Sequence, residues 1–190
     1  MKFACAMSTS GQLNFVEWLD AFNMDETDQI RTCFDQYVSG SNQSFTGIPR
    51  DCAAWVYDRM LELAVRADTE AGWGLLHKGT ATHTDEIVYD RFGPGFTDPE
   101  FKWHVDASEG DPRLVSVGAY LSESDEFQGG EFELELSDGS GTLIREYQRC
   151  AAVAFPSKRL RHVVHPVTKG ERRSFLLLVG DRTKFGSWVN

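Results

Sequence analysis

From about residue 72 onward, the chain consists of short runs of β-branched and aromatic residues separated by clusters of Gly, Asp and Pro. This pattern is typical of antiparallel β-structure, in which short strands are joined by tight turns. The sequence places candidate strands at 86–92, 102–106, 114–122, 130–136, 150–155, 160–164 and 173–179. So many strands in a segment of this length predict a sandwich or a barrel.

The first 71 residues carry a helical pattern instead. Acidic residues at 25, 26 and 28 precede apolar residues at helical spacing as far as Val38. A second amphipathic stretch begins at Pro49 or Arg50, where a proline suits a first turn, and ends near Arg66. The expected fold class is therefore mainly β with flanking helices. The length favours one domain over residues 1–190, with helical support over about 1–71 and the β core over about 72–185.

The charge balance limits the kinds of partner. Nineteen basic residues against 29 acidic residues give a net charge of −10, which argues against a nucleic-acid partner. The longest apolar runs, such as 175–180, are far shorter than the ~20 residues that cross a bilayer, so no membrane partner is expected. The N-terminal residues lack the apolar core of a secretory signal, and the four cysteines form no Cys-x-x-Cys pair. We therefore expect a cytoplasmic protein with reduced thiols.

One candidate metal-binding pair lies in the segment Phe101-Lys102-Trp103-His104-Val105-Asp106. Two side chains that are two positions apart on a strand share a face, so His104 and Asp106 are placed to chelate a divalent metal. The same pair is also common as a surface ion pair. The pair alone therefore leaves both interpretations open.

The segment from Arg161 to Ser174 supplies the remaining candidates. A histidine there would complete the two-His, one-carboxylate face that leaves three positions open on a non-haem Fe(II). His162 and His165 are both available. Arg172 follows across a turn marked by Gly170, and its planar guanidinium matches a carboxylate bidentately.

Taken in order, these segments resemble the 2-oxoglutarate and Fe(II)-dependent oxygenases, specifically the prolyl-4-hydroxylase-like branch. The resemblance covers about residues 86–180. It rests on His104-x-Asp106, Arg113-Leu114-Val115-Ser116 leading to Tyr120-Leu121-Ser122, Gly129-Gly130-Glu131-Phe132, Phe155-Pro156-Ser157, and the stretch from His162 to Ser174. It implies a double-stranded β-helix, or jelly-roll, core supported by the N-terminal α-helices.

The resemblance also implies a set of site residues. As catalytic metal ligands it implies His104, Asp106 and His162, and as cosubstrate-binding residues Arg172, Ser174 and Tyr120. Arg172 and Tyr120 would contact the distal carboxylate of 2-oxoglutarate, and Ser174 completes an Arg-x-Ser arrangement. The family pattern His-x-x-x-Pro-Val-x-x-Gly-x-Arg selects His162, so His165 is expected to be a rim or surface residue.

Some assignments stay open at this point. Where relatives often carry a tyrosine before the His-x-Asp segment, this chain has Phe92, followed by extra residues at 96–100. Tyr89 lies close by and is the alternative to Tyr120 for a contact with 2-oxoglutarate, while Tyr120 is alternatively a core residue. His77 and His83 are expected to be solvated histidines without partners.

The activity implied by the resemblance is that of a 2-oxoglutarate- and Fe(II)-dependent dioxygenase. Its cofactors would be Fe(II), 2-oxoglutarate and O2, with ascorbate as an accessory reductant, and it would couple hydroxylation to decarboxylation of 2-oxoglutarate to succinate and CO2. Asp106 favours hydroxylation, because halogenating members replace this carboxylate with a small residue.

Three interpretations of the function remain for such a chain. The branch that it resembles acts mostly on prolyl or other residues of proteins and peptides, so a protein or peptide substrate is expected. A free amino acid or other small-molecule substrate is the alternative. Outside the enzymes, the alternative is a jelly-roll binding module with a vestigial metal site. Loops at 93–101, 107–113 and 123–128 would recognise the substrate, and the oligomeric state is left open.

Overall fold

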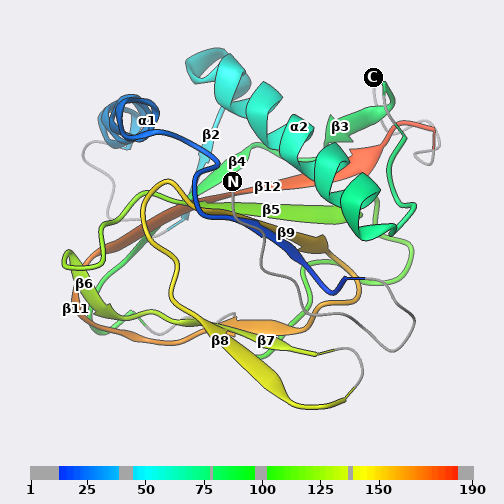
Figure 1. Ribbon diagram of the computed structural model, residues 1–190. Coiled ribbons are helices and arrows are strands. Elements are labelled where there is room, and N and C mark those ends of the chain that lie inside the picture. Colours follow the sequence, from blue (N-terminus) through cyan, green and yellow to red (C-terminus); the bar gives the residue numbers. More distant parts are fainter. Residues whose placement is uncertain (1–12, 39–44, 78, 97–101, 137–138, 184–190) are drawn as a thin grey trace.

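The computed structural model describes residues 13–38, 45–77, 79–96, 102–136 and 139–183. Their strands form two antiparallel layers (Figure 1). The large sheet has the order β1-β9-β5-β12-β4-β2, with β3 also paired to β12. Its strands are β1 (Val16–Trp18), β2 (Phe45–Ile48), β3 (Ala81–His83), β4 (Ile87–Phe92), β5 (Val115–Tyr120), β9 (Ala152–Pro156) and β12 (Arg172–Asp181).

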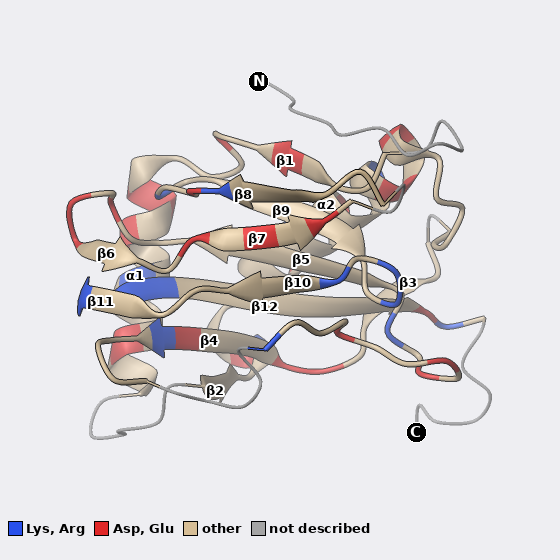
Figure 2. Ribbon diagram, turned by 90° about the horizontal axis from the view of Figure 1, so that it is seen from below, with Lys and Arg blue, Asp and Glu red and all other residues tan. Residues whose placement is uncertain are grey.

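The second layer is smaller and faces one side of the large sheet. It contains the sheet β10-β7-β8 and the ribbon β11-β6. Figure 2 shows β7, β8, β10 and β11 in front of the large sheet. Its strands are β6 (Phe127–Gly129), β7 (Phe132–Glu135), β8 (Thr142–Arg145), β10 (His162–Val164) and β11 (Val167–Gly170).

Two helices cover the opposite face of the large sheet (Figure 1). Helix α1 (Met24–Tyr37) begins with a capping box, in which Asn23 and Glu26 each accept a hydrogen bond from the other's backbone N–H. A 3-10 turn at Arg50–Cys52 precedes α2 (Ala54–Ala71), which ends at Gly72 with φ +69°. Helix α2 therefore runs five residues beyond the predicted end near Arg66, because its last turns still pack on the sheet.

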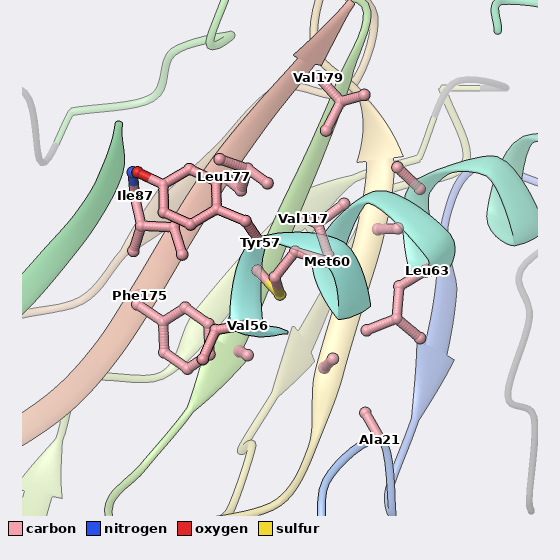
Figure 3. Packing of buried hydrophobic residues seen from close by; sticks show 14 of the residues in the cluster. Ala21, Val56, Tyr57, Met60, Leu63, Ile87, Val117, Phe175, Leu177 and Val179 are labelled. Carbon is pink, nitrogen blue, oxygen red and sulfur yellow. The ribbon is translucent and has the colours of Figure 1, made fainter. Parts of the chain in front are cut away.

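Alternation of side chains gives the large sheet two different faces. In β12, Phe175, Leu177 and Val179 belong to the core that α2 covers (Figure 3). The intervening residues Ser174 and Leu176 line a cavity between the two layers instead. The same alternation holds in β4 and β5. One face of the sheet thus builds the core, and the other face is free to build a site.

The expected mainly β class with flanking helices is confirmed, although the structure has strands that the sequence did not predict, among them β3, β6, β8 and β11. The first 71 residues are not purely helical, since β1 and β2 form the two ends of the large sheet by pairing with β9 and β4. The predicted strand 102–106 does not form, and this segment makes only an isolated bridge at His104. Both features depend on pairing between distant segments, which local sequence patterns do not report.

Within the described residues, neither helix is long and apolar enough to cross a membrane.

Candidate metal centre

The backbone brings His104 and His162 together. His162 begins β10, whereas His104 lies in the segment that precedes β5. The two residues pair in an antiparallel bridge, with N–H···O distances of 3.0 and 2.9 Å. Their imidazole rings are therefore held 4.4 Å apart, centroid to centroid. Two predicted metal-ligating histidines thus meet through main-chain hydrogen bonds.

Asp106 completes a three-residue cluster. Its Oδ1 lies 3.4 Å from the Nε2 atom of each histidine, and the three donor atoms lie within 4.8 Å of one another. The Nδ1 atoms of His104 and His162 bond the backbone carbonyls of Lys102 and Leu160, at 2.8 and 3.1 Å. A proton on each Nδ1 leaves the Nε2 lone pairs facing the centre, as metal ligation requires. This donor set fits a non-haem Fe(II) site.

Two buried hydroxyl groups support the carboxylate. Ser116 donates to Asp106 Oδ2 at 2.5 Å, and the Ser157 hydroxyl lies 2.8 Å from that of Ser116. Burial acts to raise the pKa of Asp106, but hydrogen bonds from the two histidine rings when Nε2 carries a proton, and from the Ser116 hydroxyl, outweigh it and hold the pKa well below its ordinary value in the metal-free protein. The carboxylate is therefore ionised and oriented before any metal binds.

The cluster lies at one end of a cavity of about 540 Å³ between the two layers. Its walls are largely apolar and include Val88, Phe92, Val153, Phe155 and Leu176. Of the loops expected to recognise a substrate, 107–113 contributes Arg113, which is paired with Asp111. Residues 97–101 of the expected loop 93–101 lie outside the described residues.

Arg172 lies at another end of this cavity and is only 4% exposed. Its Nη1 donates to Ser174 Oγ at 2.8 Å, and its guanidinium carbon lies 5.1 and 5.8 Å from the ring centroids of Tyr120 and Phe92. Gly130 makes room for the side chain, because a Cβ there would lie 2.8 Å from Arg172 Cδ. The guanidinium is therefore fixed between two aromatic rings.

The alternation of β-strand side chains separates Tyr120 from its alternative, Tyr89. Tyr120 lines the cavity beside Arg172, and burial raises its pKa, so the phenol is neutral. Tyr89 faces α1 on the other side of the sheet and donates to Asp35 Oδ1 at 2.8 Å. Phe92 occupies the cavity side of β4 without a hydroxyl. Only Tyr120 of the two tyrosines is placed to reach a molecule bound in the cavity.

The other histidines lie outside the cluster. His165 Nε2 lies 2.7 Å from Glu133 Oε2. The expectation that His77 and His83 lack partners is wrong, since His77 Nδ1 lies 2.7 Å from Asp181 Oδ2 and His83 Nδ1 bonds a backbone carbonyl. The Asp181 partner comes from the far end of β12, so the sequence around His77 gives no sign of it.

Asp90 is a cavity residue that the sequence motifs did not identify. It lies on β4 opposite Ser174 of β12, and Ser174 Oγ donates to Asp90 Oδ2 at 3.3 Å. Removal from bulk water raises the pKa of Asp90 to about 7, against the lowering influence of Arg172 and Ser174. The sequence did offer a sign of this role. Asp90 is the only acidic residue in the run Ile87-Val88-Tyr89-Asp90, and it lies two positions from Phe92, so strand alternation places both side chains on the same face.

Comparison with known proteins gives one family and several similar structures. Residues 88–179 match the family model described as the 2OG-Fe(II) oxygenase superfamily. The chain is similar to a prolyl-4-hydroxylase of Pseudomonas putida, with 18% identity, a TM-score of 0.66, and coverage of 89% of this chain and 93% of that one.

Two further structures resemble the chain over most of its length. One is a prolyl hydroxylase from Trichoplax adhaerens in complex with a hypoxia inducible factor peptide fragment, with 16% identity, a TM-score of 0.71, and coverage of 90% and 85%. The other is EvdO2 from Micromonospora carbonacea var. aurantiaca complexed with 2-oxoglutarate, with 12% identity, a TM-score of 0.67, and coverage of 95% and 94%. These similarities confirm the expected jelly-roll fold.

Proposed function

The chain belongs to the 2OG-Fe(II) oxygenase superfamily, and on that premise we propose that it hydroxylates a residue of a protein or peptide. The observation that carries the proposal is the arrangement of the cavity. Two imidazole Nε2 atoms and one carboxylate oxygen converge in it, and a buried guanidinium lies elsewhere on its wall. That combination suits a divalent metal together with a dicarboxylic acid.

The proposed metal ligands are His104, Asp106 and His162, which would hold Fe(II). Their three donor atoms leave room for further ligands on the cavity side, as a two-His, one-carboxylate face requires. Bound Fe(II) would activate O2, the oxidant, and so couple decarboxylation of 2-oxoglutarate to hydroxylation of the substrate. A carboxylate at Asp106, rather than a small residue, favours hydroxylation as the outcome.

The proposed cosubstrate site uses Arg172, Ser174 and Tyr120 for the distal carboxylate. On β5, Tyr120 lies four positions from Ser116, the residue that orients Asp106, so the backbones of Ser116 and Tyr120 are roughly 14 Å apart along the strand. Gly118 lies between them on the cavity side and leaves space for a bound chain. A five-carbon diacid that binds the metal at one end and Arg172 at the other would lie over Gly118.

The substrate class is supported by the neighbours and by the cavity's aromatic residues. Two of the similar proteins are prolyl hydroxylases, and one was solved with a peptide. Phe45 and Phe92 line the cavity with centroids 5.3 Å apart, and Phe96 stacks on Phe92 at 5.2 Å. Aromatic faces of this kind pack well against an aliphatic ring such as that of proline.

The first test is an anaerobic titration of the purified protein with Fe(II) and 2-oxoglutarate, which follows the visible charge-transfer band of the chelate. We expect the band to form in the wild type. In Arg172→Ala the concentration of 2-oxoglutarate needed should rise roughly 10- to 150-fold, since a hydrogen bond to a charged group contributes about 1.5–3 kcal/mol. Arg50→Ala, which removes an arginine outside the cavity lining, serves as the matched control. Absence of the band with metal bound would contradict the proposal.

The second test identifies the substrate class. Succinate release is measured with a panel of proline-containing peptides and a parallel panel of free amino acids. Stimulation by peptides supports the proposal. Stimulation by free amino acids alone would replace it with the small-molecule alternative.

A further inference from the structure

The carboxyl group of Asp90 lies close to Arg172, the arginine proposed to bind the distal carboxylate of the cosubstrate. The register of the large sheet sets Asp90 of β4, Ser174 of β12 and Tyr120 of β5 side by side on the cavity face. Asp90 is half-buried, and the surface that it keeps faces the cavity. A carboxylic acid that approaches Arg172 from the cavity therefore also meets Asp90.

The hydrogen bonds connect the two charged groups through one hydroxyl. Arg172 Nη1 donates to Ser174 Oγ at 2.8 Å, and Ser174 Oγ donates to Asp90 Oδ2 at 3.3 Å. An ionised Asp90 thus acts as a partial counter-ion for Arg172. A bound dicarboxylate would bring a second negative charge to the same guanidinium, and two carboxylates that share one site raise the pKa of one of them.

The other ionisable groups that act on Asp90 do not change charge near neutral pH, and the cavity histidines His104 and His162 are held by Mn(II) in the experiment below. Tyr120 on β5 has a raised pKa and stays neutral, whereas Asp106, across the cavity, has a lowered pKa and stays ionised. Arg172 is always charged. Phe45, the β2 neighbour of Asp90 in the sheet, carries no titratable group. Asp90, with a pKa of about 7, is the group of this set that can accept a proton.

We propose that Asp90 is a cosubstrate-binding residue that takes up one proton from solvent when the distal carboxylate of 2-oxoglutarate binds Arg172, and then donates a hydrogen bond to that carboxylate. This inference rests on the proposed function. The proton on Asp90 would convert a repulsive contact between two carboxylates into a charge-assisted hydrogen bond. This proton uptake would also make the affinity for the cosubstrate depend on pH, through a residue that is not a metal ligand.

The experiment measures the Kd of 2-oxoglutarate by calorimetry between pH 6 and pH 8.5, with Mn(II) bound in place of Fe(II) and in buffers of different ionisation enthalpy. In the wild type we expect Kd to rise about tenfold per pH unit once the pH exceeds the pKa of Asp90 in the Mn(II) protein, with an uptake that approaches one proton above that pKa. In Asp90→Asn, which donates a hydrogen bond without ionising, the slope and the proton uptake should both disappear.

The matched control is Asp35→Asn, which removes an aspartate that bonds the other face of β4 through Tyr89. It should keep the wild-type slope. A wild-type Kd that does not change with pH, or a slope that persists in Asp90→Asn, would overturn the role of Asp90 and leave the proposed function standing. Failure of 2-oxoglutarate to bind the Mn(II) protein at every pH would overturn both.

Discussion

His104 and His162 are joined by two backbone hydrogen bonds across an isolated bridge, and this bridge sets their imidazole rings 4.4 Å apart. The segment that carries His104 belongs to no regular strand, so its position depends on the bridge to β10 together with the hydrogen bonds from Ala107 N–H to the Ser157 carbonyl and from Ser116 to Asp106. The candidate metal site therefore exists only when the two layers of the fold are assembled. A metal that binds this site should stabilise the folded state over the unfolded state.

Divalent metal should raise the free energy of unfolding by about 2.7 kcal/mol at a concentration 100-fold above its Kd. His162→Ala should abolish this gain, because it removes one of three ligands. His165→Ala is the control, since His165 lies outside the cluster and bonds Glu133. Urea unfolding with and without Mn(II) checks both variants. An equal loss of the metal effect in His165→Ala would contradict the assignment of His162.

Ser116→Ala should weaken metal binding about 10- to 100-fold, because the hydroxyl orients Asp106 from behind. Ser157→Ala should have a smaller effect, since Ser157 touches the carboxylate only through Ser116. Competition with a metal chelator measures the two affinities. A larger loss of metal affinity in Ser157→Ala than in Ser116→Ala would contradict the argument that Ser116 is the hydroxyl that orients Asp106.

Gly130→Ala should weaken 2-oxoglutarate binding without weakening metal binding. The added Cβ would lie 2.8 Å from Arg172 Cδ and would displace the guanidinium. Gly139→Ala is the matched control, because Gly139 has nearly the same φ, +71° against +72°, and a Cβ there meets nothing within 4 Å. Both variants carry the backbone strain of a non-glycine residue at positive φ, about 1–2 kcal/mol. Calorimetric titration should separate them, and equal Kd values would refute the steric argument.

Tyr120→Phe should raise the Kd of 2-oxoglutarate about fivefold, in line with the loss of a hydrogen bond that contributes about 1 kcal/mol. The ring beside Arg172 is kept in this variant, so the packing is unchanged. Tyr89→Phe should leave the Kd unchanged, because Tyr89 bonds Asp35 on the far side of the sheet. The same titration compares the two variants, and a weaker complex in Tyr89→Phe would reverse the assignment.

Asp90 should make the stability of the metal-free protein fall as pH rises. Burial raises the pKa of Asp90 to about 7 from an ordinary 3.8, so the folded state holds this proton more tightly than the unfolded state does. Its contribution is full below about pH 4 and is lost as pH rises through about 7. Between pH 5 and pH 8 the wild type should lose about 3 kcal/mol relative to Asp90→Asn, at about 1.4 kcal/mol per pH unit up to pH 7. Urea unfolding of both proteins measures this, and parallel pH curves would contradict it.

Only the tertiary structure decided which side chains share the cavity. It placed Tyr120 beside Arg172 and Tyr89 on the helical face, and it added Asp90 to the cavity wall. It also recruited β1 and β2 from the N-terminal segment to the ends of the large sheet. These outcomes depend on strand register and on pairing between distant segments. A one-residue change of register reverses the face of every side chain, so short-range patterns leave such questions open.

The sequence by itself determined the mainly β class, the two helices and the run of motifs from His104 to Ser174, which lies within the residues 88–179 that match the family model. Those features depend on local periodicity and on short spacings between residues, which can be read from the sequence without knowledge of the fold. The meeting of His104 with His162, and of Asp90 with Arg172 through Ser174, is not local. Such contacts form only when the two layers close, because hydrogen bonds between distant strands bring those side chains together.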